Sequence, residues 1–209
     1  MHSVGVPDRS IAAMAAHARA EVEARLGPDD ACLLIGYSAS GTVAFEAAQQ
    51  MHAVGRSVHL MLLDAVPGVP GAGTQRDRGV TLRTASGREL PAAVLRSLRY
   101  RWELLPALWY ERVPGAPRYN PDRYRAFARI LSKASRSYVA APAAFPTTLV
   151  HVGKDELVAR AERLAPDLNL VAVGGDHHTM LLRPEVLYLA AAVEAWADAA
   201  VAEVPSAGA

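Results

Sequence analysis

The most constraining feature of the chain is a strand pattern followed by a sharp turn, a helix pattern and a second strand pattern. Residues 31–35 (ACLLI) form a short apolar run bounded by turn signals, which is typical of a strand buried on both faces. The periodicity predicts a helix over 42–54, ended by Gly55, and a second strand over 57–63, followed by Asp64. Elements in this order and at this spacing indicate a parallel βαβ unit.

Further elements extend this unit into a larger sheet. The apolar periodicity predicts two further helices, over 10–26 and from Pro184 onward, and two further strands, over 147–152 and 168–173. We therefore predict one α/β domain over residues 1–209, with its core in residues 1–67 and 143–209.

A helical insertion of about residues 68–142 separates the second strand from the third. The chain enters it through a Pro/Gly-rich stretch, and two basic helical segments follow, at about 91–112 and 120–138. The second segment has an apolar stripe at helical spacing, made of Tyr124, Phe127, Leu131, Ala134 and Tyr138.

Composition excludes several classes of protein. With 209 residues, of which 51% are hydrophobic, the chain is long enough for one sizeable core and too apolar to stay disordered. The single cysteine, Cys32, excludes an internal disulfide framework and a Cys-rich zinc site, and we expect it in the core. There is no apolar run of about 18 residues, and residues 1–10 lack the regions of a signal peptide, so we expect no membrane span and a cytoplasmic protein.

Charge is unevenly distributed along the chain, although the formal net charge is only +1. The span 76–136 holds fourteen basic and five acidic residues, a net charge of +9, whereas the rest of the chain carries −8. An asymmetry of this size indicates a segment with its own task. We do not expect a nucleic-acid partner, because the span lacks the interleaved motif of a known nucleic-acid-binding module.

The sequence Gly36-Tyr37-Ser38 lies where the first strand turns into the helix, which is the context of a nucleophile elbow. Such a turn needs small neighbours and places the exposed serine near the N-terminus of the next helix, which stabilises developing negative charge. The usual pattern is G-x-S-x-G, but here the fifth position is Ser40 and the glycine is displaced to Gly41. The alternative interpretation is an ordinary turn in which Ser38 caps the helix.

Two longer stretches, GYSASGTVAFEAAQQMHAVGRSVHLMLLDAVPG and GGDHHTML, carry a resemblance to a known family. The first resembles thioesterase domains of polyketide and nonribosomal peptide synthetases, which have a glycine-flanked serine, a helix of the form G-x-x-A-x-E-x-A and a strand ending in Leu-Asp. The matching residues are Gly41, Ala44, Glu46, Ala47, Leu63, Asp64 and Pro67. The second stretch is similar to the GDHFTM histidine loop of that family. The resemblance implies an α/β-hydrolase-type parallel sheet flanked by helices, with the insertion as a helical lid.

The resemblance also implies the roles of individual residues. Ser38 would be the nucleophile, His177 the general base and Asp64 the acid that orients the histidine, while the backbone N–H of Ala39 would donate to the oxyanion. These roles agree with physical chemistry, because a serine hydroxyl needs an adjacent base and imidazole can return the proton to a leaving thiol.

Two alternatives remain open within this set. Asp155 also follows a predicted strand end and could replace Asp64, although the LLD-x-x-P context resembles the thioesterases at Asp64. His178 could replace His177, although the G-D-H of the family aligns on His177.

The beginning of the chain departs from the family pattern. The family normally starts with strands and a glycine-rich loop, often H-P-x-G-G, which supplies the second oxyanion donor, and residues 1–10 hold no such segment. We therefore expect an exposed apolar sheet edge at residues 31–35. We also expect the chain to be an N-terminally truncated fragment (the C-terminal part of a larger synthetase), a mis-started reading frame or a degenerate relative.

The function that the resemblance implies is release of an acyl or peptidyl chain from a phosphopantetheinyl carrier protein, by hydrolysis or cyclisation. The phosphopantetheine arm would arrive with the substrate, so we expect no bound cofactor and no metal. The basic lid would suit an acidic acyl or peptidyl carrier protein and the phosphodiester of its arm. The alternatives are a generic serine esterase or lipase and a catalytically impaired module that docks a carrier protein.

Overall fold

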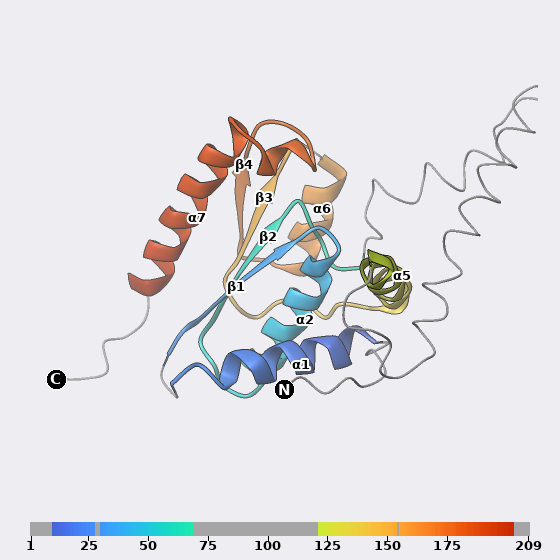
Figure 1. The fold of residues 1–209 in the computed structure, drawn as a ribbon. Helices are drawn as coiled ribbons and strands as arrows, with labels where there is room; N and C mark the ends of the chain where they lie inside the picture. The colour runs from blue at the N-terminus through green and yellow to red at the C-terminus, as the bar shows by residue number, and fades with distance from the viewer. Residues whose placement is uncertain (1–9, 28–29, 69–120, 154, 203–209) are drawn as a thin grey trace, which may run out of the picture.

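The computed structural model describes residues 10–27, 30–68, 121–153 and 155–202 (Figure 1). Within these ranges the elements are α1 (Ile11–Glu23), β1 (Cys32–Tyr37), α2 (Ser40–Ala53), β2 (Val58–Leu63), α5 (Pro121–Ser137), β3 (Thr147–His151), α6 (Asp155–Leu164), β4 (Leu168–Ala172), the 3₁₀ turn η1 (Thr179–Leu181) and α7 (Glu185–Ala202). The predicted helix over 91–112 and most of the basic span lie outside the described residues.

The four strands of the described sheet are parallel and follow the order β1-β2-β3-β4. Parallel neighbours need crossover connections, which α2 supplies between β1 and β2 and α6 between β3 and β4. Because all strands run in one direction, their carboxyl ends meet at one edge of the sheet. The predicted fold, a parallel sheet flanked by helices, is confirmed (Figure 1).

β1 lies at the edge of the described sheet, and this position corrects one prediction. We expected a strand buried on both faces, but among the described residues Ile35 is 46% exposed, and Leu33 and Leu34 are only partly buried. An edge strand has a neighbour on one side only, so fewer side chains cover it. The expected apolar edge at residues 31–35 is thus found within the described part of the chain.

Two hydrophobic clusters lie on opposite faces of the sheet. The first, on the side of α2 and α6, includes Cys32, Phe45, Met51, Leu60, Leu62 and Ala161. The second, on the side of α7, includes Met61, Leu63, Val150, Met180 and Leu189. Successive residues of β2 alternate between the clusters because side chains alternate along a strand. Cys32 is in the core, as predicted, and burial raises the pKa of its thiol. No helix in the described ranges is long and apolar enough to cross a membrane.

α5 packs against α1. Leu131 and Ala134 of the predicted apolar stripe are buried there, together with Ile130, against Ile11 and Met14. Phe127, which belongs to the same stripe, is 50% exposed, since the described contact with α1 begins only at Ile130.

A hydrogen-bonded network fastens the segment after α5 to α2. The Tyr138 hydroxyl donates to Glu46 Oε2 at 2.6 Å, and Gln50 Nε2 donates to Glu46 Oε1 at 2.8 Å and to the Ala12 carbonyl at 3.1 Å. Burial and the bond to Glu46 raise the pKa of Tyr138, so its hydroxyl remains a donor. Glu46 of the helix motif therefore joins α2 to the end of the insertion, and Gln50 joins α2 to α1.

Candidate active site

Ser38 lies at a strained turn between β1 and α2. β1 ends at Tyr37 and α2 begins at Ser40, so only two residues connect them. Ser38 has a φ of 54°, in the left-handed region that residues other than glycine rarely adopt. Backbone strain of this kind, between a strand and a helix, is what a nucleophile elbow requires. The structure therefore supports the elbow over an ordinary turn.

The glycines on either side of Ser38 allow the strand and the helix to approach closely. A Cβ added at Gly36 would lie 2.7 Å from the Gly41 Cα, and one added at Gly41 would lie 2.5 Å from the Ala65 Cβ. Ser40, the fifth residue of the motif, is exposed and donates from Oγ to the Tyr37 carbonyl at 2.6 Å. The helix therefore approaches the sheet closely at Gly41 and not at Ser40, which explains why a serine side chain fits at position 40.

We expect Gly41→Ala to lower the free energy of unfolding by about 1–3 kcal/mol, because α2 must move away from Ala65 to admit the methyl group. Urea unfolding measures this change. The control is Ser40→Ala, which adds no bulk at an exposed position and should change the free energy by less than about 0.5 kcal/mol. Equal stability of the two variants would contradict the close packing of α2 on the sheet.

Asp64 follows β2 in a second strained turn, next to the first. Its φ is 44°, and its side chain has no exposed surface. The backbone N–H of Ser38 donates to the Leu63 carbonyl at 3.2 Å, and the N–H of Asp64 donates to the Val150 carbonyl at 2.7 Å. The hydrogen bonds that join the strands thus continue into both turns and hold Ser38 and Asp64 at the same edge of the sheet.

The loop after β4 presents His177 at this edge. The Asp176 carboxylate accepts hydrogen bonds from the backbone N–H groups of His178 at 2.8 Å and Thr179 at 2.9 Å, and Thr179 Oγ1 accepts from the Asp176 N–H at 2.8 Å. The bonds from Thr179 and His178 lower the pKa of Asp176. Their contribution to stability is therefore present above the ordinary carboxyl pKa and is lost as the pH falls through the lowered one. The buried Met180 anchors the turn in the second cluster.

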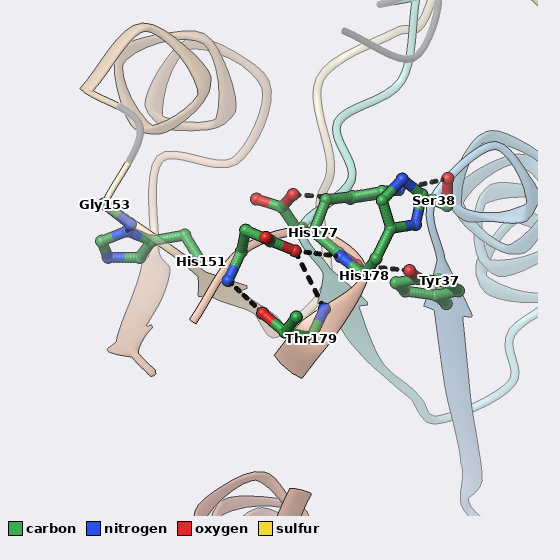
Figure 2. Close-up of polar contacts among 9 residues, drawn as sticks. Tyr37, Ser38, His151, Gly153, His177, His178 and Thr179 are labelled. Atoms are coloured by element: carbon green, nitrogen blue, oxygen red, sulfur yellow. Dashed lines mark hydrogen bonds and ion pairs between the residues drawn. The ribbon is translucent and has the colours of Figure 1, made fainter. Parts of the chain in front are cut away.

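These three loops bring Asp64, His177 and Ser38 into one hydrogen-bonded chain (Figure 2). His177 Nδ1 lies 2.6 Å from Asp64 Oδ2, and His177 Nε2 lies 2.8 Å from Ser38 Oγ. An ionised carboxylate can only accept, so Nδ1 carries the proton and Nε2 keeps a lone pair toward the serine hydroxyl. This arrangement can remove the hydroxyl proton as Ser38 attacks an electrophile.

The two alternative residues lie elsewhere in the structure. Asp155 is the exposed first residue of α6, where a carboxylate stabilises a helix N-terminus. His178 is exposed and meets the His177 ring edge-on, with 5.1 Å between the ring centroids. The two ring nitrogens that hydrogen-bond to Asp64 and Ser38 therefore belong to His177 and not to His178.

Ala39, the predicted oxyanion donor, is the N-cap residue of α2. Its backbone N–H follows Ser38 directly and lies at the N-terminus of a 14-residue helix, where the helix dipole favours negative charge. We expected the second oxyanion donor to be missing because residues 1–10 lack the glycine-rich loop of the family. Residues 1–9 of that segment lie outside the described residues. Donation by Ala39 stays a prediction.

Two further parts of this site were not predicted from the sequence. One is the turn closed by Asp176 and Thr179, for which an aspartate that can hydrogen-bond to nearby backbone N–H groups was an available signal. The other is Tyr37, whose ring stacks on that of His177 and whose hydroxyl donates to the His177 carbonyl. Its position next to Ser38 did not indicate these contacts. In the described part of the chain, no three His, Cys, Asp or Glu side chains converge to hold a metal ion.

Comparison with protein families now gives the affiliation. Residues 2–191 match the alpha/beta hydrolase family. The chain belongs to this family. No curated protein matches the chain. In this alpha/beta hydrolase, the strained serine turn and the hydrogen-bonded chain from Asp64 to Ser38 lie at the carboxyl edge of the parallel sheet.

Solved structures of similar fold include two thioesterases and a nonribosomal peptide synthetase. The thioesterase domain NocB, as a covalent complex with a fluorophosphonate nocardicin G analogue, is 20% identical with a TM-score of 0.59, over 89% of this chain and 74% of NocB. YbtT, a type II thioesterase of the yersiniabactin pathway, is 20% identical with a TM-score of 0.56, over 90% and 74%. The four-domain nonribosomal peptide synthetase AB3403 is 20% identical with a TM-score of 0.59, over 90% of this chain but only 16% of the synthetase. At these identities the similarity establishes the fold.

Proposed function

We propose that this alpha/beta hydrolase is a serine thioesterase that releases an acyl or peptidyl chain from a phosphopantetheinyl carrier protein. The observation that carries the proposal is the hydrogen-bonded chain from Asp64 through His177 to Ser38 at the carboxyl edge of the sheet. Structural similarity to NocB and YbtT supports a thioester substrate. The proposed reaction needs no bound cofactor, because the phosphopantetheine arm is part of the substrate.

In the first proposed step, Ser38 Oγ attacks the thioester carbonyl and His177 Nε2 accepts the hydroxyl proton. Asp64 holds the imidazole in the correct tautomer and stabilises its charged form. The negative charge of the tetrahedral intermediate develops next to Ala39 at the N-terminus of α2, where the backbone N–H can donate to it. As the C–S bond breaks, His177 gives the proton to the thiolate, and the acyl group remains on Ser38.

The second proposed step releases the acyl chain. A water molecule, or a hydroxyl or amine of the chain itself, attacks the acyl-Ser38 ester while His177 accepts its proton. The C–O bond to Ser38 then breaks, and His177 returns the proton to Ser38 Oγ. The products are a free acid when the nucleophile is water and a macrocycle when it is internal.

We expect Asp64→Asn to lower kcat by about 10⁴-fold, because the amide no longer selects the tautomer that leaves Nε2 free to accept a proton. Asparagine tolerates the left-handed backbone of this position, so the turn should survive. Asp155→Asn is the matched control and should retain kcat near that of the wild type, since Asp155 is an exposed residue of α6. Steady-state hydrolysis of an acyl thioester measures both. The reverse order of effects would assign the acid to Asp155.

Basic residues on α5 support an acidic carrier protein as the partner. Arg129, Lys133 and Arg136 are exposed and recur at helical spacing, so they lie along one side of the helix. Complementary charge speeds the encounter of two proteins and selects the partner.

We therefore expect charge reversal on α5 to weaken binding of the carrier without changing the chemistry. Arg129→Glu with Lys133→Glu should raise KM for an acyl-loaded carrier protein by about tenfold and leave KM for a free acyl thioester unchanged. Arginine, lysine and glutamate have similar helix propensities, so the helix should persist. The control Arg163→Glu reverses an exposed charge on α6. An equal rise in the control, or a rise for the free thioester, would contradict docking at α5.

The experiment that tests the proposed function compares three substrates at equal acyl chain: a carrier-linked thioester, a free thioester and an oxygen ester. We expect the highest kcat/KM for the carrier-linked thioester. A preference for the oxygen ester without any carrier dependence would identify a generic esterase. Binding of the carrier without turnover of any substrate would identify a docking module.

A further inference from the structure

We propose that Tyr37 is a positioning residue that holds His177 in reach of Ser38, an inference that rests on the proposed hydrolase function. The Tyr37 and His177 rings are stacked, with 5.0 Å between their centroids and 18° between their planes. The Tyr37 hydroxyl also donates to the His177 backbone carbonyl at 2.5 Å. Figure 2 shows Tyr37 and Ser38 both directed toward His177 from the end of β1.

These two contacts constrain parts of His177 that Asp64 does not. The bond from Nδ1 to Asp64 fixes the direction of one ring nitrogen but leaves the ring free to rotate about that bond. Stacking on Tyr37 fixes the plane of the ring, and the bond to the carbonyl fixes the backbone that carries it. The His177 side chain is 22% exposed, so solvent does not confine it on its open side. Together the three contacts determine where Nε2 lies.

The place of Tyr37 in the sheet couples the base to the nucleophile. Tyr37 directly precedes Ser38, and in the parallel register it pairs with Leu63, which directly precedes Asp64. Tyr37 therefore links the end of β1, which carries Ser38, to the loop that carries His177. We expect this link to maintain the 2.8 Å separation of Nε2 and Oγ, on which proton transfer depends.

Two substitutions at Tyr37 separate its two contacts. Tyr37→Leu removes the stacked ring and the hydroxyl, and we expect kcat to fall by about 10²-fold, the cost of a misplacement of about 1 Å at a reacting group. Tyr37→Phe keeps the ring, and we expect it to restore kcat to within about tenfold of the wild type. KM should change by less than about twofold in both variants, because Tyr37 acts through His177 and not on the substrate.

The deciding experiment is a double-mutant cycle with His177→Ala, in which the unfolding free energy of every variant is also measured. If Tyr37 acts through His177, then Tyr37→Leu changes the residual rate of the His177→Ala variant by less than about twofold. The stacking role is overturned if Tyr37→Leu lowers the rate of the His177→Ala variant as much as it lowers that of the wild type. It is also overturned if Tyr37→Phe loses as much kcat as Tyr37→Leu. If Tyr37→Leu does not fold, the cycle is run with Tyr37→Phe, whose smaller loss must then vanish in the His177→Ala background.

The same measurements distinguish this proposal from the function on which it rests. A wild-type chain that turns over no ester or thioester refutes the hydrolase function, and the positioning role with it. If the wild type is active and Tyr37→Leu has the same effect in the His177→Ala background as in the wild type, only the positioning role is refuted.

Discussion

Replacement of Ser38 by alanine should lower kcat for thioester hydrolysis by about 10⁶-fold, which is the largest effect expected of any single substitution in this chain. In the proposed mechanism Ser38 forms the covalent bond to the acyl group, and its hydroxyl lies 2.8 Å from His177 Nε2. Alanine removes only this hydroxyl. The variant should therefore fold like the wild type, and acid-quenched time courses of acyl release measure the loss.

Ser40→Ala is the matched control for this experiment. Ser40 lies two residues further along the same turn, and its Oγ is engaged with the Tyr37 carbonyl rather than with His177. We expect the control to retain activity within about tenfold of the wild type. If Ser38→Ala kept the activity of the control, Ser38 would not be the nucleophile and the turn would be a strained structural element only.

His177→Ala should have an effect of similar size, about 10⁶-fold in kcat, because nucleophile and base act as a unit. Without His177 nothing in the described site accepts the proton of Ser38 at hydrogen-bonding distance. A combined Ser38→Ala and His177→Ala variant should be about as active as either single variant, since each removes the same covalent route. The three variants are compared by steady-state hydrolysis with equal thioester concentrations.

The neighbouring His178 supplies the control for the base. His178→Ala keeps the backbone N–H that donates to the Asp176 carboxylate, so the turn that presents His177 should remain closed. We expect activity within about tenfold of the wild type. A larger loss in His178→Ala than in His177→Ala would exchange the roles of the two histidines.

The fold was predictable where the pattern is local and both faces of an element are covered. β2 shows this best, because all six of its residues are buried and five of them are apolar, a pattern that a central parallel strand accommodates. The prediction failed for Ile35, whose exposure depends on which elements lie beside it and not on its own sequence. A periodic stripe identifies the face of a helix, but it does not show how far along the helix a partner extends.

The candidate site was predictable from residue types and their position at strand ends. Ser38, Asp64 and His177 each follow a strand of a parallel sheet, and the resemblance to thioesterases selected them from other candidates. The sequence alone left Asp155 and His178 as alternatives, because a sequence pattern does not distinguish one strand end from another or one of two adjacent histidines from the other. Hydrogen bonds of 2.6 and 2.8 Å to one histidine separate them in the structure. The role of Tyr37 is a contact across 140 residues and left no local signal.

The central claim, that Ser38 is an activated nucleophile, is tested most directly by a fluorophosphonate that carries an acyl chain. NocB, which has a similar fold, is known as a covalent complex with a fluorophosphonate nocardicin G analogue. We expect one stoichiometric adduct by intact mass, located on the peptide that contains Ser38, prevented by His177→Ala and slowed by an acyl-loaded carrier protein. An adduct on another residue, or a folded wild-type chain that hydrolyses thioesters without any adduct, would contradict the claim.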